Sequence, residues 1–278
     1  MEGVKVAVVG AGPAGSSAAV QLSKEGLDFV LYEKDSVGGL LRYANYMDNL
    51  LGHRGINGSD MCSLIEDHLK GMNIEVTRSE VVNIRLENSE FLILAKGETK
   101  RFTHVILAAG SIPNRLDIPG CLYYIENPLI YNSRRILIIG GGDLAYDNAL
   151  RLSNNGADVT IMVRNRSSAN SGLIRKARDA GIDVISGDPE DIDLIGGKYS
   201  LPDGSSFDHC AAFIGRTPNT GLIDDLGDIG IDRLTGKTSV KGLYVIGDAA
   251  LGTMSQAALA SGMGLVAAMD IARLVRNG

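Results

Sequence analysis

The sequence predicts an α/β fold with two similar domains, the second of them inserted into a discontinuous first domain. Three observations support this prediction. A short apolar run leads into a glycine-rich turn at Gly10, the same pattern returns from Ile136, and another buried run ends at Gly247. Short apolar runs that alternate with helical segments are typical of parallel sheets covered by helices on both faces.

The first strand–turn–helix–strand unit extends from Val4 to Lys34. Its opening run is mostly β-branched and apolar, as in a strand buried on both faces, and consists of Val4, Val6, Ala7, Val8 and Val9. The turn has the spacing G-x-G-x-x-G, in which the glycines allow a tight turn, close approach of a pyrophosphate and close helix–strand packing. The following helix N-terminus favours an anion. The residues predicted to face the phosphates are Gly10, Gly12, Pro13, Ala14 and Gly15.

The second strand of this unit, Phe29–Tyr32, is followed by Glu33, which lies 33 − 10 = 23 positions after Gly10. A carboxylate at this place accepts hydrogen bonds from ribose hydroxyls. Strand, turn, helix and acid together predict a dinucleotide site, with Glu33 and Lys34 on its ribose side.

An internal repeat supplies a second unit. The run from Val6 recurs from Ile136, with alanine in the packing role of the third glycine. The residues predicted to bind phosphates in this second site are Gly140, Gly142, Asp143, Leu144 and Ala145.

The second unit lacks the acidic residue. Val163 takes the place of Glu33, and Arg164 and Arg166 follow it. A guanidinium binds a 2′-phosphate through paired N–H groups, whereas a carboxylate repels it. The second site is therefore predicted to prefer NADP, with NAD as the other candidate. The alternative interpretation is that both arginines are solvated loop residues.

The segments around the second unit predict how the first domain is completed. Residues 76–82, 91–95 and 105–108 are expected to form a small β-meander that leads back into the first sheet. Small residues at Ala109 and Gly110 would let the backbone approach a ligand.

Later strands are expected at residues 182–185, 210–214 and 242–248, followed by a helix that begins near Ser255 or Gln256. We therefore predict two Rossmann-like dinucleotide-binding domains: residues 1–114 with 220–278, and the inserted residues 115–219.

Composition narrows the function classes. The net charge of −6 and the pI of about 5.3 argue against a nucleic-acid partner. No signal sequence is recognised, and polar residues interrupt the apolar stretch 257–275, so we expect a cytoplasmic protein with no membrane segment. Three cysteines without a C-x-x-C motif suggest neither a disulfide scaffold nor a metal site. No acid–base or nucleophilic catalytic residues stand out.

Taken together, the motifs resemble the thioredoxin reductase family of two-dinucleotide flavoprotein oxidoreductases over nearly the full length. The resemblance rests on the two glycine turns, Glu33 and these further segments: Gly38-Gly39-Leu40, Asp48-Asn49 with Gly52, Ala108-Ala109-Gly110, Gly215–Asn219, and Gly247-Asp248 with Gln256-Ala257. It implies FAD in the first domain, NADP in the second, a homodimer, and hinges at residues 114–120 and 216–220.

The resemblance also implies roles for single residues around FAD. Asp248 would bind the ribityl chain, and backbone N–H groups near Gln256 and Ala257 would face the flavin, where a helix N-terminus stabilises the negative charge of its reduced form. The other implied contacts are Gly39, Leu40 and Asn49 along the ring, Val82 at the adenine, and Ala109, Gly110, Gly247 and, in the second domain, Gly215.

One departure separates this chain from that family. Where the family has its redox-active C-x-x-C pair, this sequence has Tyr123 and Glu126. Cys121 is nearby, but Cys62 and Cys210 are expected in distant segments, so no intramolecular pair is predicted. We therefore expect an FAD-dependent NAD(P)H oxidoreductase whose electron acceptor is not an internal disulfide. The acceptor is unknown, and a small redox protein is one candidate.

Three alternatives remain open at this point. The first is a ferredoxin or flavodoxin NADP reductase. The second is a non-catalytic FAD-binding regulatory module, because the arginine set of the second site is incomplete. The third is a reductase that uses Cys121 together with the thiol of a partner.

Overall fold

The computed structural model describes residues 5–277, so Val4, predicted as part of the first strand, lies outside the described residues. The chain forms two compact units. Unit 1 contains the described residues up to Arg42, Asp48–Ile112 and those from Thr217 onward; unit 2 contains Tyr43–Met47 and Pro113–Arg216. The short segment Tyr43–Met47 was expected in the first domain, and it clusters with unit 2, where the Asn45 N–H donates to Asp147 Oδ2 at 2.9 Å.

Unit 1 is built on a five-stranded parallel sheet with the strand order β17-β7-β1-β2-β3. A strand from late in the chain thus completes the sheet that the first strand begins. The apolar residues of β1 are buried, as expected where both faces of a parallel sheet are covered. The strands are β1 (Lys5–Val9), β2 (Asp28–Glu33), β3 (Val76–Arg78), β7 (His104–Leu107) and β17 (Leu243–Val245).

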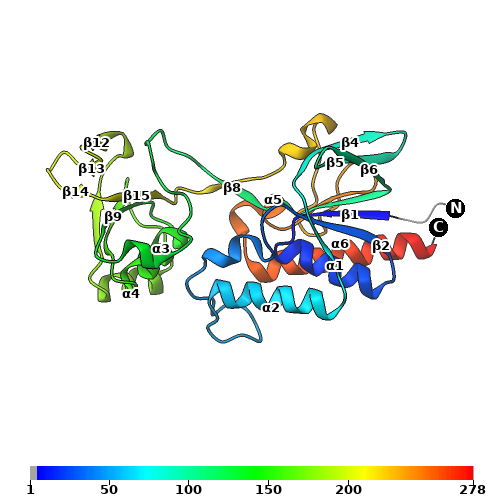
Figure 1. The fold of residues 1–278 in the computed structure, drawn as a ribbon, viewed down its shortest axis with the longest axis horizontal. Coiled ribbons are helices and arrows are strands. Elements are labelled where there is room, and N and C mark those ends of the chain that lie inside the picture. The colour runs from blue at the N-terminus through cyan, green and yellow to red at the C-terminus, as the bar shows by residue number, and fades with distance from the viewer. Residues whose placement is uncertain (1–4, 278) are drawn as a thin grey trace. The chain divides into compact units, whose positions relative to one another are not determined.

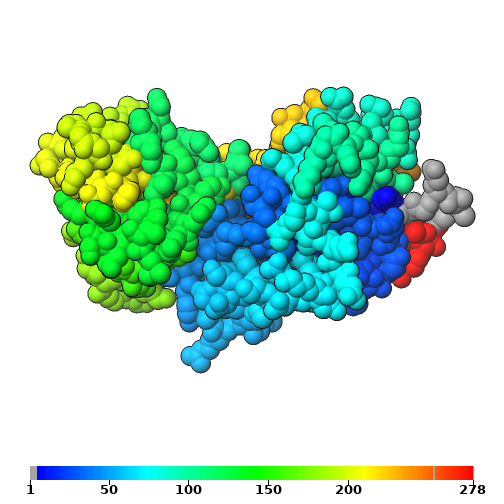
Figure 2. Space-filling view, viewed as in Figure 1, coloured from blue at the N-terminus to red at the C-terminus, as the bar shows by residue number. Residues whose placement is uncertain are grey.

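Helices cover one face of this sheet, and α1 (Pro13–Lys24) packs on α6 (Ala257–Asn277) there (Figure 1). The contact is so close that a Cβ on Gly264 would lie 2.1 Å from the Ala14 carbonyl oxygen. Among the described residues, α6 is the one helix long and apolar enough to cross a membrane, but its inner face belongs to the unit 1 core. Helix α2 (Gly58–Gly71) lies on the outside, with little of it buried (Figure 2).

An antiparallel meander covers the other face (Figure 1). It consists of β4 (Val81–Glu87), β5 (Glu90–Ala95) and β6 (Glu98–Phe102). The prediction of one strand over residues 76–82 was wrong: the chain breaks at Ser79, so β3 joins the parallel sheet and β4 begins the meander. Strand β6 was not predicted, because four of its five residues are polar and exposed.

Unit 2 has a four-stranded parallel sheet in the order β11-β10-β9-β15. Ile136 and Ile138 face the core that includes the helices, whereas Leu137 and Ile139 face an antiparallel sheet of three short strands. The elements are β9 (Arg135–Ile139), α3 (Asp143–Ser153), β10 (Asp158–Val163), α4 (Ser171–Asp179), β11 (Asp183–Ser186), β12 (Asp193–Ile195), β13 (Lys198–Ser200), β14 (Ser206–Phe207) and β15 (His209–Ala212).

The two chain crossings between the units form a short two-stranded sheet of β8 (Ser111–Pro113) and β16 (Arg216–Pro218). The remaining elements are short helical turns: η1 (Gly39–Tyr43), η2 (Pro128–Tyr131), η3 (Pro189–Asp191), η4 (Gly221–Leu226), α5 (Asp248–Leu251) and η5 (Gly252–Met254).

Candidate dinucleotide sites

The glycine turn of unit 1 contains glycines that the fold requires and one glycine that leaves open space. A Cβ on Gly10, whose φ is +104°, would lie 2.4 Å from the Ala108 carbonyl oxygen, and one on Gly15 would lie 1.8 Å from the Gly10 oxygen. The fold itself therefore requires glycine at both positions. A Cβ on Gly12 would meet no protein atom within 4 Å. Gly12 is also the N-cap of α1 and provides no side-chain cap, so the first turn keeps open space and N–H groups for an anion.

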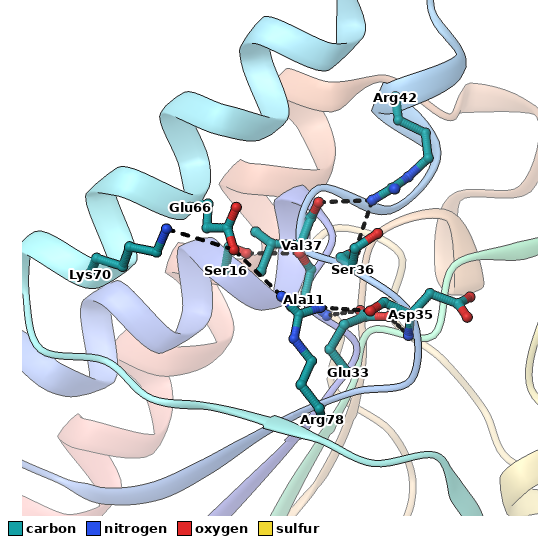
Figure 3. A network of polar contacts seen from close by, with 10 residues as sticks. All are labelled: Ala11, Ser16, Glu33, Asp35, Ser36, Val37, Arg42, Glu66, Lys70 and Arg78. Carbon is teal, nitrogen blue, oxygen red and sulfur yellow. Dashed lines mark hydrogen bonds and ion pairs between the residues drawn. The ribbon is translucent and has the colours of Figure 1, made fainter. Parts of the chain in front are cut away.

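Glu33 ties the end of β2 to this turn (Figure 3). Its Oε2 accepts from the Ala11 N–H at 2.7 Å, and its Oε1 accepts from the Asp35 N–H at 2.8 Å. The side chain is buried, yet each carboxylate oxygen has further lone pairs with which to accept a hydroxyl. The position that the sequence assigned to ribose binding therefore also fixes the local backbone.

Two arginines organise the loop that follows, and sequence reasoning missed both (Figure 3). The Arg42 guanidinium donates to the carbonyl oxygens of Ser36, Val37 and Gly39 at 3.0–3.1 Å. Arg78 donates to the Asp35 oxygen at 2.6 Å. Neither arginine lies in a sequence motif that would have singled it out.

Residues far apart in the sequence meet at the start of α6. Asn49 Nδ2 donates to Gln256 Oε1 at 2.7 Å across 207 positions of sequence. Helix α6 begins at Ala257, one residue after the expected start. A Cβ on Gly247 would lie 2.8 Å from the Ala14 Cβ, so the turn before Asp248 approaches α1 closely. The same Cβ would lie 3.7 Å from the Ala260 Cβ on α6, so the Asn49 and Gly247 segments both contact the start of α6 within unit 1.

The other predicted residues of unit 1 have varied surroundings. A Cβ on Gly39 would lie 3.4 Å from the Gly12 Cα, so that segment adjoins the glycine turn, and Leu40 follows it in η1. The Lys34 ammonium lies 3.9 Å from Glu80 on the surface. Val82 is 54% exposed and sits at an irregularity where the β4–β5 register skips it. The Asn219 side-chain amide donates to the Ala109 carbonyl oxygen, and the Asn219 backbone N–H donates to the Gly110 carbonyl oxygen.

The glycine turn of unit 2 repeats this division of roles. A Cβ on Gly140 would lie 2.4 Å from the Phe213 oxygen, whereas one on Gly142 would meet nothing within 4 Å. Ala145 is buried beneath the turn in place of a third glycine. Asp143 Oδ1 accepts from the Asn170 N–H at 2.6 Å, so this carboxylate holds the loop after β10, and the Leu144 side chain is partly exposed.

A pocket of about 560 Å³ lies over the carboxyl ends of the unit 2 strands. Five of the predicted residues line it: Gly140, Gly142, Arg164, Arg166 and Gly215. Arg164 Nε lies 3.4 Å from Asp188 Oδ2, so its charge is partly compensated by an acid that sequence reasoning did not consider. Parallel α/β sheets bind ligands at this edge.

Comparison with known proteins identifies the family. The model of the pyridine nucleotide-disulphide oxidoreductases matches residues 4–264. The chain belongs to this family. It is 26% identical to a thioredoxin reductase of Mycolicibacterium smegmatis, covering 96% of this chain and 95% of that one. The structure of thioredoxin reductase from Lactococcus lactis superposes with a TM-score of 0.87 at 24% identity, covering 99% and 100% of the two chains.

A bacillithiol disulfide reductase from Staphylococcus aureus also shares the fold, with a TM-score of 0.78, 21% identity and 99% of both chains covered. The protein is thus a thioredoxin reductase-like oxidoreductase with two dinucleotide-binding domains, a family that implies FAD and NADPH.

Within this oxidoreductase, the prediction that no two cysteines meet was wrong. Cys121 Sγ and Cys210 Sγ lie 3.8 Å apart in unit 2. They meet because the segment around Leu122 pairs with β15 in parallel at Ala211, a non-local contact that spacing does not reveal. Cys62 is partly buried against Gly38, and burial raises the pKa of its thiol.

Tyr123 and Glu126 belong to the framework of unit 2. The Tyr123 hydroxyl donates to the Leu116 oxygen at 3.0 Å and accepts from the Leu116 N–H at 2.8 Å, which closes a loop. The Glu126 backbone oxygen accepts from Arg151 at 3.1 Å. The described residues contain no cluster of three or more metal-binding side chains.

Proposed function

We propose that this protein uses NADPH to reduce bound FAD and passes the electrons to an acceptor other than an internal C-x-x-C disulfide. The proposal rests on two open glycine turns, one beside Glu33 and one beside Arg164 and Arg166. It also rests on Tyr123 and Glu126, which stand in place of a C-x-x-C pair and belong to a structural loop.

The residues of unit 1 fit FAD. Gly12 and the first turn of α1 would receive the pyrophosphate, and Glu33 would accept the ribose hydroxyls. Asp248 would bind the ribityl chain, and the Asn49–Gln256 pair with the N-terminus of α6 would lie at the ring. When bound, FAD supplies the two-electron chemistry, by accepting hydride from the nicotinamide and passing electrons onward.

The residues of unit 2 support binding of NADPH with modest selectivity over NADH. Arg166 is exposed at the rim of the pocket, where a guanidinium could bind a 2′-phosphate. Asp188 opposes this preference, because it compensates part of the charge on Arg164 and would repel the phosphate.

We propose an external electron acceptor because the close cysteine pair of this chain is not part of the nucleotide pocket. Among the described residues, the close thiol pair involves Cys210, in the amino-terminal half of β15. The pocket is lined by Phe213, Ile214 and Gly215 beyond the carboxyl end of that strand. Cys210 lies three strand residues, about 10 Å, before Phe213, and neither Cys121 nor Cys210 lines the nucleotide pocket. An external acceptor, such as a small redox protein, accounts best for this arrangement.

A homodimer in the cytoplasm is the assembly we propose. The outer face of α6 carries exposed apolar residues at helical spacing: Leu259, Leu265, Val266 and Met269. A second copy would cover this face. Sedimentation should give a dimer that Met269→Glu converts to a monomer; a wild-type monomer would contradict this assembly.

An acceptor panel tests the proposed reaction. Purified FAD-loaded protein with NADPH should reduce at least one of ferredoxin, flavodoxin, a quinone or oxygen, and Cys121→Ser should leave that rate unchanged. Efficient reduction of thioredoxin that disappears in Cys121→Ser would contradict the proposal. Bound FAD that NADPH does not reduce would instead favour a non-catalytic module.

A further inference from the structure

We propose that Cys121 and Cys210 are a redox modification site: they form a reversible disulfide by exchange with a low-molecular-weight disulfide. The site lies in unit 2, neither cysteine lines the nucleotide pocket, and the proposal does not depend on the proposed electron acceptor.

The backbone already holds the two cysteines at disulfide distance. The Leu122 N–H donates to the Cys210 oxygen and the Ala212 N–H donates to the Leu122 oxygen, both at 2.8 Å. Leu122 and Ala211 are parallel bridge partners, so Cys121 and Cys210 are neighbours one residue earlier. Adjacent strands lie about 4.8 Å apart, inside the Cα separation of roughly 4.4–6.8 Å that disulfides span. Closing the 3.8 Å between the sulfurs therefore requires side-chain rotation with little backbone movement.

The two thiols differ in a way that assigns their order of reaction. Cys210 is fully buried, and its hydrogen bond with Cys121, together with burial, raises its pKa strongly. Cys121 is partly exposed, and the hydrogen bond with Cys210 lowers its pKa. The thiolate is the nucleophile in exchange. Cys121 is therefore the attacking residue, and Cys210 is the resolving one.

The reaction balances without another oxidant. The Cys121 thiolate attacks one sulfur of R–S–S–R, forms Cys121–S–S–R and releases one thiolate. Cys210 then loses its proton and attacks Cys121 Sγ, which forms the Cys121–Cys210 bond and expels the second thiolate. Two cysteine thiols are oxidised, and one external disulfide is reduced to two thiols. The first step also removes the negative charge on Cys121 that raises the pKa of Cys210, so it prepares the second.

The disulfide would fasten a covering loop to the central sheet. That loop is held by the backbone bonds of Leu122 to the sheet, by the Tyr123–Leu116 hydrogen bonds and by the bond from the Tyr199 hydroxyl to the Pro119 oxygen at 2.9 Å. The cross-link joins positions 89 residues apart, which removes much entropy from the unfolded chain. Oxidation should therefore raise the thermal unfolding midpoint, and reduction should restore it.

Thiol mapping of the full-length protein tests this proposal. The protein is equilibrated with oxidised glutathione, quenched with acid, alkylated and digested. We expect a peptide pair linked through Cys121 and Cys210, while Cys62 stays available for alkylation after denaturation. Cys210→Ala should instead accumulate a glutathione adduct on Cys121, and Cys121→Ser should leave Cys210 unmodified. Cys62→Ala is the matched control and should cross-link as the wild type does.

Several outcomes would overturn the proposal. These are wild-type protein that keeps both thiols reduced, wild-type protein that stops at the Cys121 adduct, or a cross-link that leaves the unfolding midpoint unchanged. If a cysteine variant fails to fold, the wild-type peptide map and the midpoint still decide. Flavin binding plays no part in these readouts, so a failed flavin assay leaves this result intact.

Discussion

The Glu33 carboxylate accepts a hydrogen bond from the backbone N–H of Ala11 at 2.7 Å, which joins the end of β2 to the glycine turn between β1 and α1. The same carboxylate also accepts a hydrogen bond from the Asp35 N–H at 2.8 Å. A residue expected only to bind ribose therefore also shapes the turn on which the pyrophosphate would lie. The proposed FAD binding and the local stability should therefore be coupled at this position.

Glu33→Gln should weaken both properties. The amide keeps one acceptor oxygen but directs an NH₂ group toward a backbone N–H, so we expect a loss of about 2 kcal/mol in unfolding free energy. FAD affinity should fall roughly tenfold or more. Flavin titration and urea unfolding measure the two effects. The control Glu90→Gln breaks an exposed ion pair with Arg101 and should change neither. An unchanged FAD affinity in Glu33→Gln would contradict the assigned role.

Two glycines of the same turn should respond differently to alanine. Gly12→Ala adds a methyl group into open space at a φ of −71°, so folding should lose at most about 1 kcal/mol while FAD affinity falls at least roughly tenfold. Gly15→Ala places the methyl group 1.8 Å from the Gly10 oxygen and should cost about 3 kcal/mol of stability. Thermal unfolding of the apoprotein and flavin titration separate the two. Equal destabilisation by both substitutions would refute this division.

The nucleotide preference should depend on three side chains around the unit 2 pocket. Arg166→Ala should raise the KM for NADPH roughly tenfold and leave that for NADH unchanged, since only NADPH carries the 2′-phosphate. Asp188→Asn should shift the preference toward NADPH, because it frees Arg164 while keeping the oxygen that accepts from the Glu190 N–H. Steady-state kinetics with both nucleotides test this. Equal changes for NADH and NADPH would show that neither residue reads the phosphate.

How far the sequence predicted this structure depended on the range of the interactions. The glycine turns were predictable because sterics admit only glycine where a Cβ would meet the backbone, as at Gly10 and Gly140. Glu33 followed from its place after a strand. The break at Ser79 was missed because Val76 and Val81 were taken as parts of one strand, although the four residues between them are polar. The meeting of Cys121 with Cys210 depends on the register between distant segments, which no local pattern encodes.

A partly buried carboxylate on α6 should make the stability of unit 1 sensitive to acid. Burial disfavours the charged form of Asp270, but the Tyr244 hydroxyl at 2.6 Å and the Lys237 ammonium at 2.9 Å outweigh it and hold the pKa of this carboxyl below its ordinary value. The folded-state pKa is thus lower than the unfolded value of about 3.9. The resulting stability is present above that value and is lost as the pH falls through the folded pKa.

Asp270→Asn should therefore destabilise the protein by about 1–3 kcal/mol at neutral pH, and its difference from the wild type should shrink below about pH 4. Urea unfolding over this pH range measures both quantities. Asp179→Asn, which alters an exposed acid on α4, is the control and should show no such trend. A constant difference at all pH values would mean that the charge of Asp270 does not stabilise the protein.

The central claim is that unit 1 holds FAD and unit 2 delivers electrons from NADPH. It is tested most directly by loading the purified protein with FAD and titrating it with NADPH without oxygen while recording the flavin absorbance. We predict stoichiometric flavin binding and complete bleaching by NADPH, at lower concentrations than NADH requires. Failure to bind added FAD, or bound flavin that neither nucleotide bleaches, would contradict the account.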